Sequence, residues 1–480
     1  MENYKFSTLP YQRPDLEARR TQLARWQDAV EQAESFDALR ALLFEMDRAN
    51  GELSTQCAIA HIRHTLDTRD AFYEAEIHYL QDTLPTLGAA EVALSEAIAS
   101  SPFRPDIERE FGRQYFVAID LQKKQFCEAN VPLRQQESRL TNEYQKIMAA
   151  AEIPFDGKTL NLYGVQKYFE HPDRAVRAAA VKAYSAFYET NEPRLEEIWD
   201  ELIRIRNQMG KNLGYENYIP LGYLEQGRTD YGEKEVASFR EQVRTVLVPL
   251  CQKLYDAQAK RLGIDHVMWH DEKMVFPDGN AEPAGDAGFM VETARKMYHE
   301  ISPETGEFID FMIDHELMDL QNKPGKASTG YMTSLPSLKA PFVFSCFNHT
   351  IFDMQVLTHE LGHAFHNHIL NDQRALNRDY TMPVAETAST FNECVVMNAA
   401  IAAATDREEK LALIESQLSD ATQIICDIYS RYRFESAVFA GRENDFLPAD
   451  RLCGMMLEAQ KQSYGDGLDE HVLHPYMWVC

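Results

Sequence analysis

The stretch VLTHELGHAFH (356–366) contains the spacing His-Glu-x-x-His, in which both histidines can act as metal ligands. On an α-helix, residues four apart lie one above the other, so the imidazoles of His359 and His363 can close on one metal ion. Glu360 is turned by about 100° from His359, which places its carboxylate beside the metal, where it can take a proton from a water molecule on the metal. The pattern therefore predicts a hydrolytic zinc site with Glu360 as the general base.

A hydrolytic zinc site needs three protein ligands and one open position for water. A second helix is expected to begin around 381–383, with a proline in its first turn. On that helix Glu386 and Glu393 share one stripe with two hydroxyl side chains, Ser389 and Thr390. We favour Glu386 as the third ligand, because a loop delivers the start of a helix more readily than its middle. Glu393 is the alternative, and without a third ligand the two histidines would be ordinary helical residues.

The helix that carries the histidines also needs a face for the protein core. Leu357, Leu361, Ala364 and Phe365 gather opposite the histidines. Gly362 lies between the two faces and weakens a helix interior by roughly 1 kcal/mol relative to alanine. We therefore expect a close backbone approach at Gly362, either by a substrate or by another helix.

Composition excludes several classes of protein. The 480 residues are 45% hydrophobic and 26% charged, and 48 basic against 75 acidic side chains give a net charge of −27, so we expect neither nucleic acid nor a membrane surface as a partner. The N-terminus lacks the apolar segment of a signal peptide, and the longest apolar run, near 395–404, is too short to span a bilayer. Eight scattered cysteines without a C-x-x-C pair indicate reduced thiols in a cytoplasmic protein.

Amphipathic helices are predicted for most of the chain. Asp15, Ser35 and Asp173 stand where helices should begin, and a further helix is expected to start near Pro193. The turn at 153–158 separates the first set of helices from the second. These signals predict a mainly α-helical fold.

Two short strands are predicted just before the histidine helix, at Tyr331–Leu335 and Pro341–Phe347. A free edge of the second strand would allow an extended peptide to pair with it through main-chain hydrogen bonds and to lie along the metal. A hairpin that only covers the core is the alternative.

Three segments resemble the thimet oligopeptidase and oligoendopeptidase F family of zinc metallopeptidases, and its oligoendopeptidase branch in particular. They are APFVFSCFN (340–348), VLTHELGHAFH (356–366) and PVAETASTFNE (383–393), and SPETGEF (302–308) is also similar. The resemblance covers most of 170–480 strongly and the N-terminal part more loosely.

The resemblance implies a multi-helical, two-lobed fold with a deep central channel that admits oligopeptides. It implies one Zn²⁺ per chain, held by His359, His363 and Glu386, with Glu360 as the general base. We accordingly predict an N-terminal helical lobe at 1–165 and a catalytic lobe at 166–480.

The resemblance ends at the C-terminus of the sequence. In similar sequences the stretch like HPYMW (474–478) continues into a segment whose histidine and tyrosines bind substrate and stabilise the oxyanion, whereas this sequence ends at Cys480. We therefore interpret the catalytic lobe as C-terminally shortened, with Tyr331, Tyr464 and Tyr476 as conceivable substitutes.

The predicted function is that of a cytoplasmic zinc endopeptidase that hydrolyses internal peptide bonds of oligopeptides. Two alternatives stay open. The first is a helical peptide-binding protein with an impaired zinc site, and the second is a carboxypeptidase that releases dipeptides from C-termini. The sequence does not indicate the oligomeric state.

Overall fold

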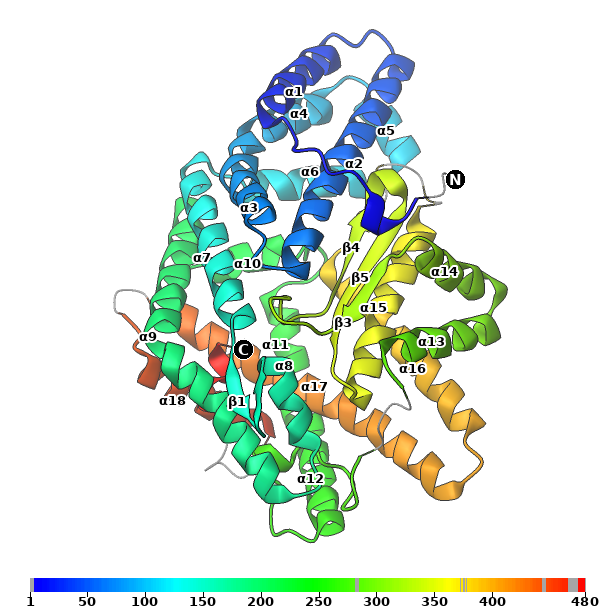
Figure 1. Cartoon of the computed structure of the whole chain (residues 1–480). Helices are drawn as coiled ribbons and strands as arrows, with labels where there is room; N and C mark the ends of the chain where they lie inside the picture. The colour runs from blue at the N-terminus through cyan, green and yellow to red at the C-terminus, as the bar shows by residue number, and fades with distance from the viewer. Residues whose placement is uncertain are drawn as a thin grey trace.

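Helices dominate the structure, a computed structural model that describes residues 4–280, 285–371, 373, 376, 378–442, 446–464 and 474–479 (Figure 1). The predicted mainly α-helical fold is confirmed. The α-helices are α1 (Leu16–Glu31), α2 (Phe36–Leu66), α3 (Ala71–Thr83), α4 (Gly88–Ser100), α5 (Arg104–Phe111), α6 (Gln114–Gln125), α7 (Val131–Ala149), α8 (Leu162–Gln166), α9 (Arg174–Asn212), α10 (Ile219–Glu225), α11 (Glu233–Gln242), α12 (Val248–Leu262), α13 (Ala287–Ile301), α14 (Pro303–Asp314), α15 (Ile351–Leu370), α16 (Met382–Ala403), α17 (Arg407–Gly441) and α18 (Ala449–Tyr464). The strands are β1 (Ile153–Phe155), β2 (Lys158–Leu160), β3 (Met318–Gln321), β4 (Tyr331–Leu335) and β5 (Ala340–Phe347).

Three helices begin where side chains of the expected type can cap them. Asp15, Ser35 and Asp173 each accept a hydrogen bond from a main-chain N–H of the first turn of α1, α2 and α9. These bonds satisfy N–H groups that have no partner within the helix. The predicted starts of these three helices are confirmed.

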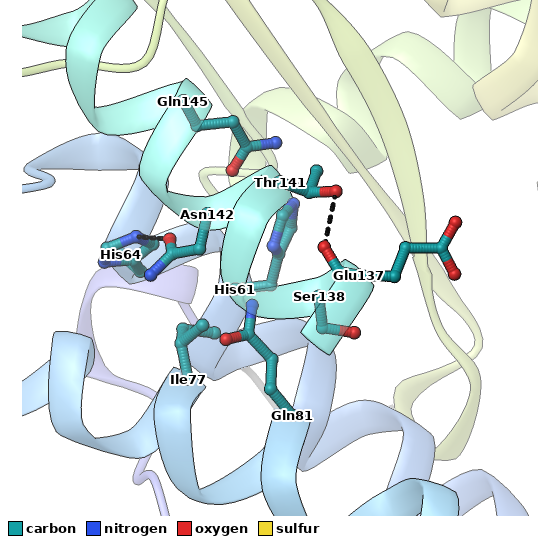
Figure 2. A pocket seen from close by; sticks show the side chains of 9 residues that line it. All are labelled: His61, His64, Ile77, Gln81, Glu137, Ser138, Thr141, Asn142 and Gln145. Carbon is teal, nitrogen blue, oxygen red and sulfur yellow. Dashed lines mark hydrogen bonds between the residues drawn. The ribbon is translucent and has the colours of Figure 1, made fainter. Parts of the chain in front are cut away.

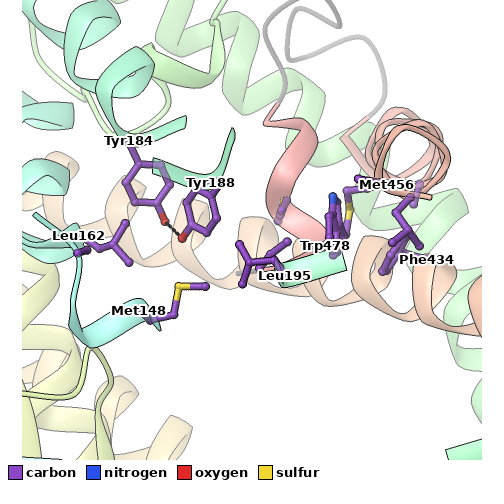
Figure 3. Packing of buried hydrophobic residues seen from close by; sticks show 14 of the residues in the cluster. Met148, Leu162, Tyr184, Tyr188, Leu195, Phe434, Met456 and Trp478 are labelled. Carbon is purple, nitrogen blue, oxygen red and sulfur yellow. Dashed lines mark hydrogen bonds between the residues drawn. The ribbon is translucent and has the colours of Figure 1, made fainter. Parts of the chain in front are cut away.

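The predicted helix start near Pro193 is wrong, because α9 continues through this proline. An internal proline costs a helix about 3 kcal/mol. Both halves of α9 are buried in the same hydrophobic cluster, Tyr184 and Tyr188 before the proline and Leu195 after it. Figure 3 shows these side chains together with Phe434 and Trp478 from the C-terminal helices. Burial of this continuous face outweighs the local cost.

The sheet next to the histidine helix has the strand order β3-β5-β4. Strand β5 pairs antiparallel with β4 and parallel with β3, so it is hydrogen-bonded on both sides. Both predicted strands are present, but the expected free edge of the strand before the histidine helix is wrong, because β3 occupies it. A peptide that adds to this sheet on the opposite side must pair with β4.

A buried lysine, Lys326, links two strands of this sheet. Its side chain is fully buried, and its ammonium donates to the Asp319 carboxylate at 2.5 Å. It also donates to the main-chain carbonyls of Asp319, Gln321 and Ser345 at 2.5–3.1 Å. One ammonium group therefore joins β3 to β5, with four acceptor oxygens within reach of its three N–H groups.

The sheet lies between helices that are far apart in the sequence. Ile59 and Ile62 of α2 share a buried cluster with Phe342 and Phe344 of β5 and with Leu361 of α15. Figure 1 shows α2 and α15 on either side of β4 and β5. The predicted lobe boundary at 165/166 stays a prediction. The cluster shows that N-terminal side chains support the sheet that precedes α15.

Among the described residues, no helix combines the length and the apolar character needed to cross a lipid bilayer. The seven described cysteines are free thiols, and Cys480 lies outside the described residues.

Candidate metal centre

Helix α15 begins with a reciprocal cap and presents two faces. The Thr350 hydroxyl accepts from the Asp353 N–H, and the Asp353 carboxylate accepts from the Thr350 N–H. On one face Leu357, Leu361 and Ala364 are buried in the cluster around the sheet. This leaves the opposite face for the two histidines, as the sequence pattern predicts.

Helix α16 lies against α15 at backbone distance. A Cβ atom built on Gly362 would stand 2.8 Å from the Ser389 Cα and 3.1 Å from the Ala388 carbonyl oxygen. The Asn392 amide of α16 donates to the main-chain carbonyl of Thr358 at 2.7 Å. The close approach expected at Gly362 is therefore made by another helix.

This contact brings together His359, His363 and Glu386. Their ligand atoms all lie within 4.8 Å of one another. The two Nε2 atoms are 3.1 Å apart, and the Glu386 Oε2 lies 3.3 Å from Nε2 of His359 and 3.6 Å from Nε2 of His363. The Ser389 hydroxyl donates to the same Glu386 oxygen at 3.1 Å and steadies the carboxylate.

The geometry of these three atoms fits zinc. A tetrahedral ion with bonds of about 2.0–2.2 Å separates its ligand atoms by about 3.3–3.6 Å, close to the three distances found here. The donor set of two imidazoles and one carboxylate is typical of hydrolytic zinc sites, which leave a fourth position open. Within the part of the chain that the structure describes, no other group of three histidine, cysteine or acidic residues has this arrangement.

The alternative ligand, Glu393, lies on the other side of the His359 ring. Its Oε1 atom is 2.6 Å from Nδ1 of His359 and is not part of the three-residue group. The main-chain carbonyl of Ala385 in α16 lies near the His363 ring and favours its protonated form. Burial by itself lowers the pKa of both histidines, but the Glu393 hydrogen bond and nearby carboxylates bring the pKa of His359 above its usual value.

Glu360 is buried beside this group. Its Oε2 atom has no hydrogen-bond partner among the described residues, while the nearby main-chain amide of Met332 in β4 favours the charged carboxylate. Burial, assisted by the Glu386 carboxylate, raises the pKa of Glu360 to about 7, although His359 and the Met332 amide act in the opposite direction. A carboxylate with a pKa near 7 can both take up and release a proton near neutral pH.

The three tyrosines considered as substitutes for an oxyanion donor have other contacts. Tyr331 stacks on Phe344 and shares a hydrogen bond with Thr65. Tyr464 donates to Asp427, and Tyr476 donates to Glu192. These bonds hold the three hydroxyls in structural contacts of the fold.

A separate cavity of about 290 Å³ lies between α2, α3 and α7 (Figure 2). Its lining is polar except for Ile77. Burial lowers the pKa of His61 and His64, so both imidazoles are neutral at pH 7, and Glu137 is paired with arginines. The cavity therefore offers neutral hydrogen-bonding groups, whereas Glu360 and the three candidate metal ligands lie on α15 and α16.

Comparisons with known proteins agree with this geometry. Residues 6–126 match the model of the peptidase M3 N-terminal domain, and residues 292–472 match that of peptidase family M3. The solved structure of PZ peptidase A with an inhibitor is 34% identical in sequence to this chain and has a TM-score of 0.91. The match covers 99% of this chain and 84% of that structure.

Two curated relatives are more distant. The chromosomal oligoendopeptidase F of Lactococcus lactis subsp. cremoris and the group B oligopeptidase PepB of Streptococcus agalactiae are each 22% identical over 65% of this chain. The match covers 51% of each relative, so the chain spans about half the length of the curated relatives it matches.

Proposed function

The chain belongs to peptidase family M3, and on that premise we propose that it is a zinc-dependent endopeptidase that hydrolyses internal bonds of oligopeptides. The observation that carries the proposal is the convergence of His359, His363 and Glu386 next to the buried Glu360. The names of the relatives, oligoendopeptidase and oligopeptidase, support the substrate class.

In the proposed reaction, His359, His363 and Glu386 hold one zinc ion. The ion supplies Lewis-acid chemistry, since it lowers the pKa of water and polarises a carbonyl oxygen. Glu360 accepts a proton from the attacking water and passes it to the nitrogen of the leaving amine. Its burial suits both steps, because a carboxyl group with a pKa near 7 exchanges protons readily at neutral pH.

The sheet supports this arrangement from the other side. The main-chain amide of Met332 in β4 favours the charged form of the Glu360 carboxylate. Because β5 is paired on both sides, the edges of the sheet belong to β3 and β4, and the β4 edge, which borders α15, is the one we propose for a substrate backbone.

The proposal is tested with the purified full chain. We expect one zinc per chain by atomic absorption, cleavage of a quenched fluorescent oligopeptide, and loss of cleavage with a chelator. Loss of the ligand atoms in a His359→Ala, His363→Ala variant should abolish zinc binding. Stoichiometric zinc in that double variant would refute the site. If all products were dipeptides released from the C-terminus, the protein would be a carboxypeptidase and not an endopeptidase.

A further inference from the structure

The two imidazoles of the metal centre have different partners on α16. The His363 ring lies near a main-chain carbonyl, that of Ala385, whereas the His359 ring bonds to a side-chain carboxylate, that of Glu393. The Glu393 contact of 2.6 Å is made by Nδ1, so Nε2 of His359 is left facing His363 and Glu386.

We propose that Glu393 is a positioning residue, which holds His359 in the tautomer and ring orientation required for zinc; this inference rests on the function proposed above. A carboxylate that accepts the Nδ1–H keeps the proton on that nitrogen and leaves the lone pair of Nε2 for the metal. The negative charge of Glu393 also makes the imidazole a stronger donor to a cation.

Hydrogen bonds of the neighbouring residues fix the position of Glu393 relative to α15. Consecutive residues of α16 bond to consecutive residues of α15, since Asn392 donates to the Thr358 carbonyl and Glu393 accepts from His359. The Asn392 amide nitrogen also lies 2.7 Å from the Tyr298 hydroxyl of α13. Glu393 is thus presented from a segment that is itself anchored at two points, which restricts the His359 ring to one orientation.

Glu393 and Glu386 have distinct places, although both lie on one stripe of α16. Glu386 shares the Nε2 side with both histidines, and Glu393 lies on the Nδ1 side of one of them. Replacement of Glu393 therefore leaves all three ligand atoms present, and its effect measures the alignment of His359 alone.

The test measures the zinc dissociation constant by competition with a chromophoric chelator. We expect Glu393→Ala to raise this constant about 10–100-fold. Glu393→Gln should raise it less, because an amide oxygen still accepts the Nδ1–H. The matched control is Asp420→Asn, which removes a carboxylate that lies near Glu393 and bonds to Gln355 and Ser416 rather than to a histidine. This control should keep the wild-type constant.

Two further measurements separate alignment from folding. The metal-free Glu393→Ala protein should melt within a few degrees of the metal-free wild type, and its cobalt-loaded form should show an altered visible absorption spectrum. A Glu393→Ala constant within twofold of wild type, or an equal loss in Asp420→Asn, would overturn the inference. If Glu393→Ala does not fold, the isosteric Glu393→Gln variant decides the matter alone. Absence of zinc binding by the wild type would instead refute the proposed function.

Discussion

The close contact at Gly362 predicts that Gly362→Ala, which adds one carbon atom, weakens zinc binding. In Gly362→Ala the new Cβ would lie 2.8 Å from the Cα of Ser389 and from the Cβ of Asn392. It must move by about 0.6 Å to reach ordinary van der Waals contact at 3.4 Å. Both neighbours are on α16, three residues after Glu386 and one residue before Glu393, so α16 must move away from α15.

The size of this displacement sets the expected loss. Metal–ligand bonds tolerate deviations of about 0.2 Å, so a shift of about 0.6 Å takes Glu386 out of its bonding position. We expect the zinc dissociation constant of Gly362→Ala to rise about 10–100-fold. The overpacking costs about 1–3 kcal/mol, which the better helix propensity of alanine offsets by about 1 kcal/mol. The free energy of unfolding should therefore fall by up to about 2 kcal/mol.

Chelator competition and urea unfolding measure the two quantities. Gly454→Ala is the matched control, since it is also a helical glycine and a Cβ there meets nothing within 4 Å. This control should gain about 0.5–1 kcal/mol of stability and keep its zinc affinity. A Gly362→Ala protein with wild-type affinity and a similar gain would show that α16 does not depend on this contact.

Three further predictions concern other sites. Glu360→Gln should lower peptide turnover about 10²–10⁴-fold at an unchanged zinc dissociation constant, and turnover near wild type would exclude Glu360 as the base. Burial lowers the pKa of His474 to about 3, so the unfolded chain binds the proton first as pH falls below 6.5. The free energy of unfolding should thus drop by about 1.6 kcal/mol between pH 6.5 and 5, and His474→Phe should lack this component in urea titrations. Lys326→Met should lower the free energy of unfolding by about 3 kcal/mol in the same assay, because four acceptor oxygens lose their donor. An unchanged free energy would show that the fold does not need the ammonium group.

Local signals in the sequence predicted those parts of the fold that local chemistry determines. Asp15, Ser35 and Asp173 are suitable caps, and each caps a helix. Pro193 is an equally strong local signal for a helix start, but α9 continues through it because its buried face extends on both sides of the proline. Strand β3 was not predicted because MDLQ (318–321) is only four residues long and is ordered by its parallel partner β5, which lies about 20 residues further along the chain.

The candidate site shows the same limit. Helical spacing is enough to place His359 beside His363, and the stripe on α16 is enough to select Glu386 and Glu393 as candidates. Which carboxylate meets Nε2 and which meets Nδ1 depends on how α16 crosses α15. That crossing depends on Gly362, for which the sequence left two explanations open. The arrangement of the ligands is thus a tertiary property.

Because the candidate ligands come from two helices, α15 and α16, occupancy of the centre is thermodynamically linked to the fold. An ion bound only when α15 and α16 are docked stabilises the docked state by mass action, by about 4 kcal/mol when free zinc exceeds its dissociation constant a thousandfold. The zinc concentration would then determine the lifetime of the folded protein as well as its catalytic rate. At low zinc, α15 and α16 would separate more often and become accessible to proteases.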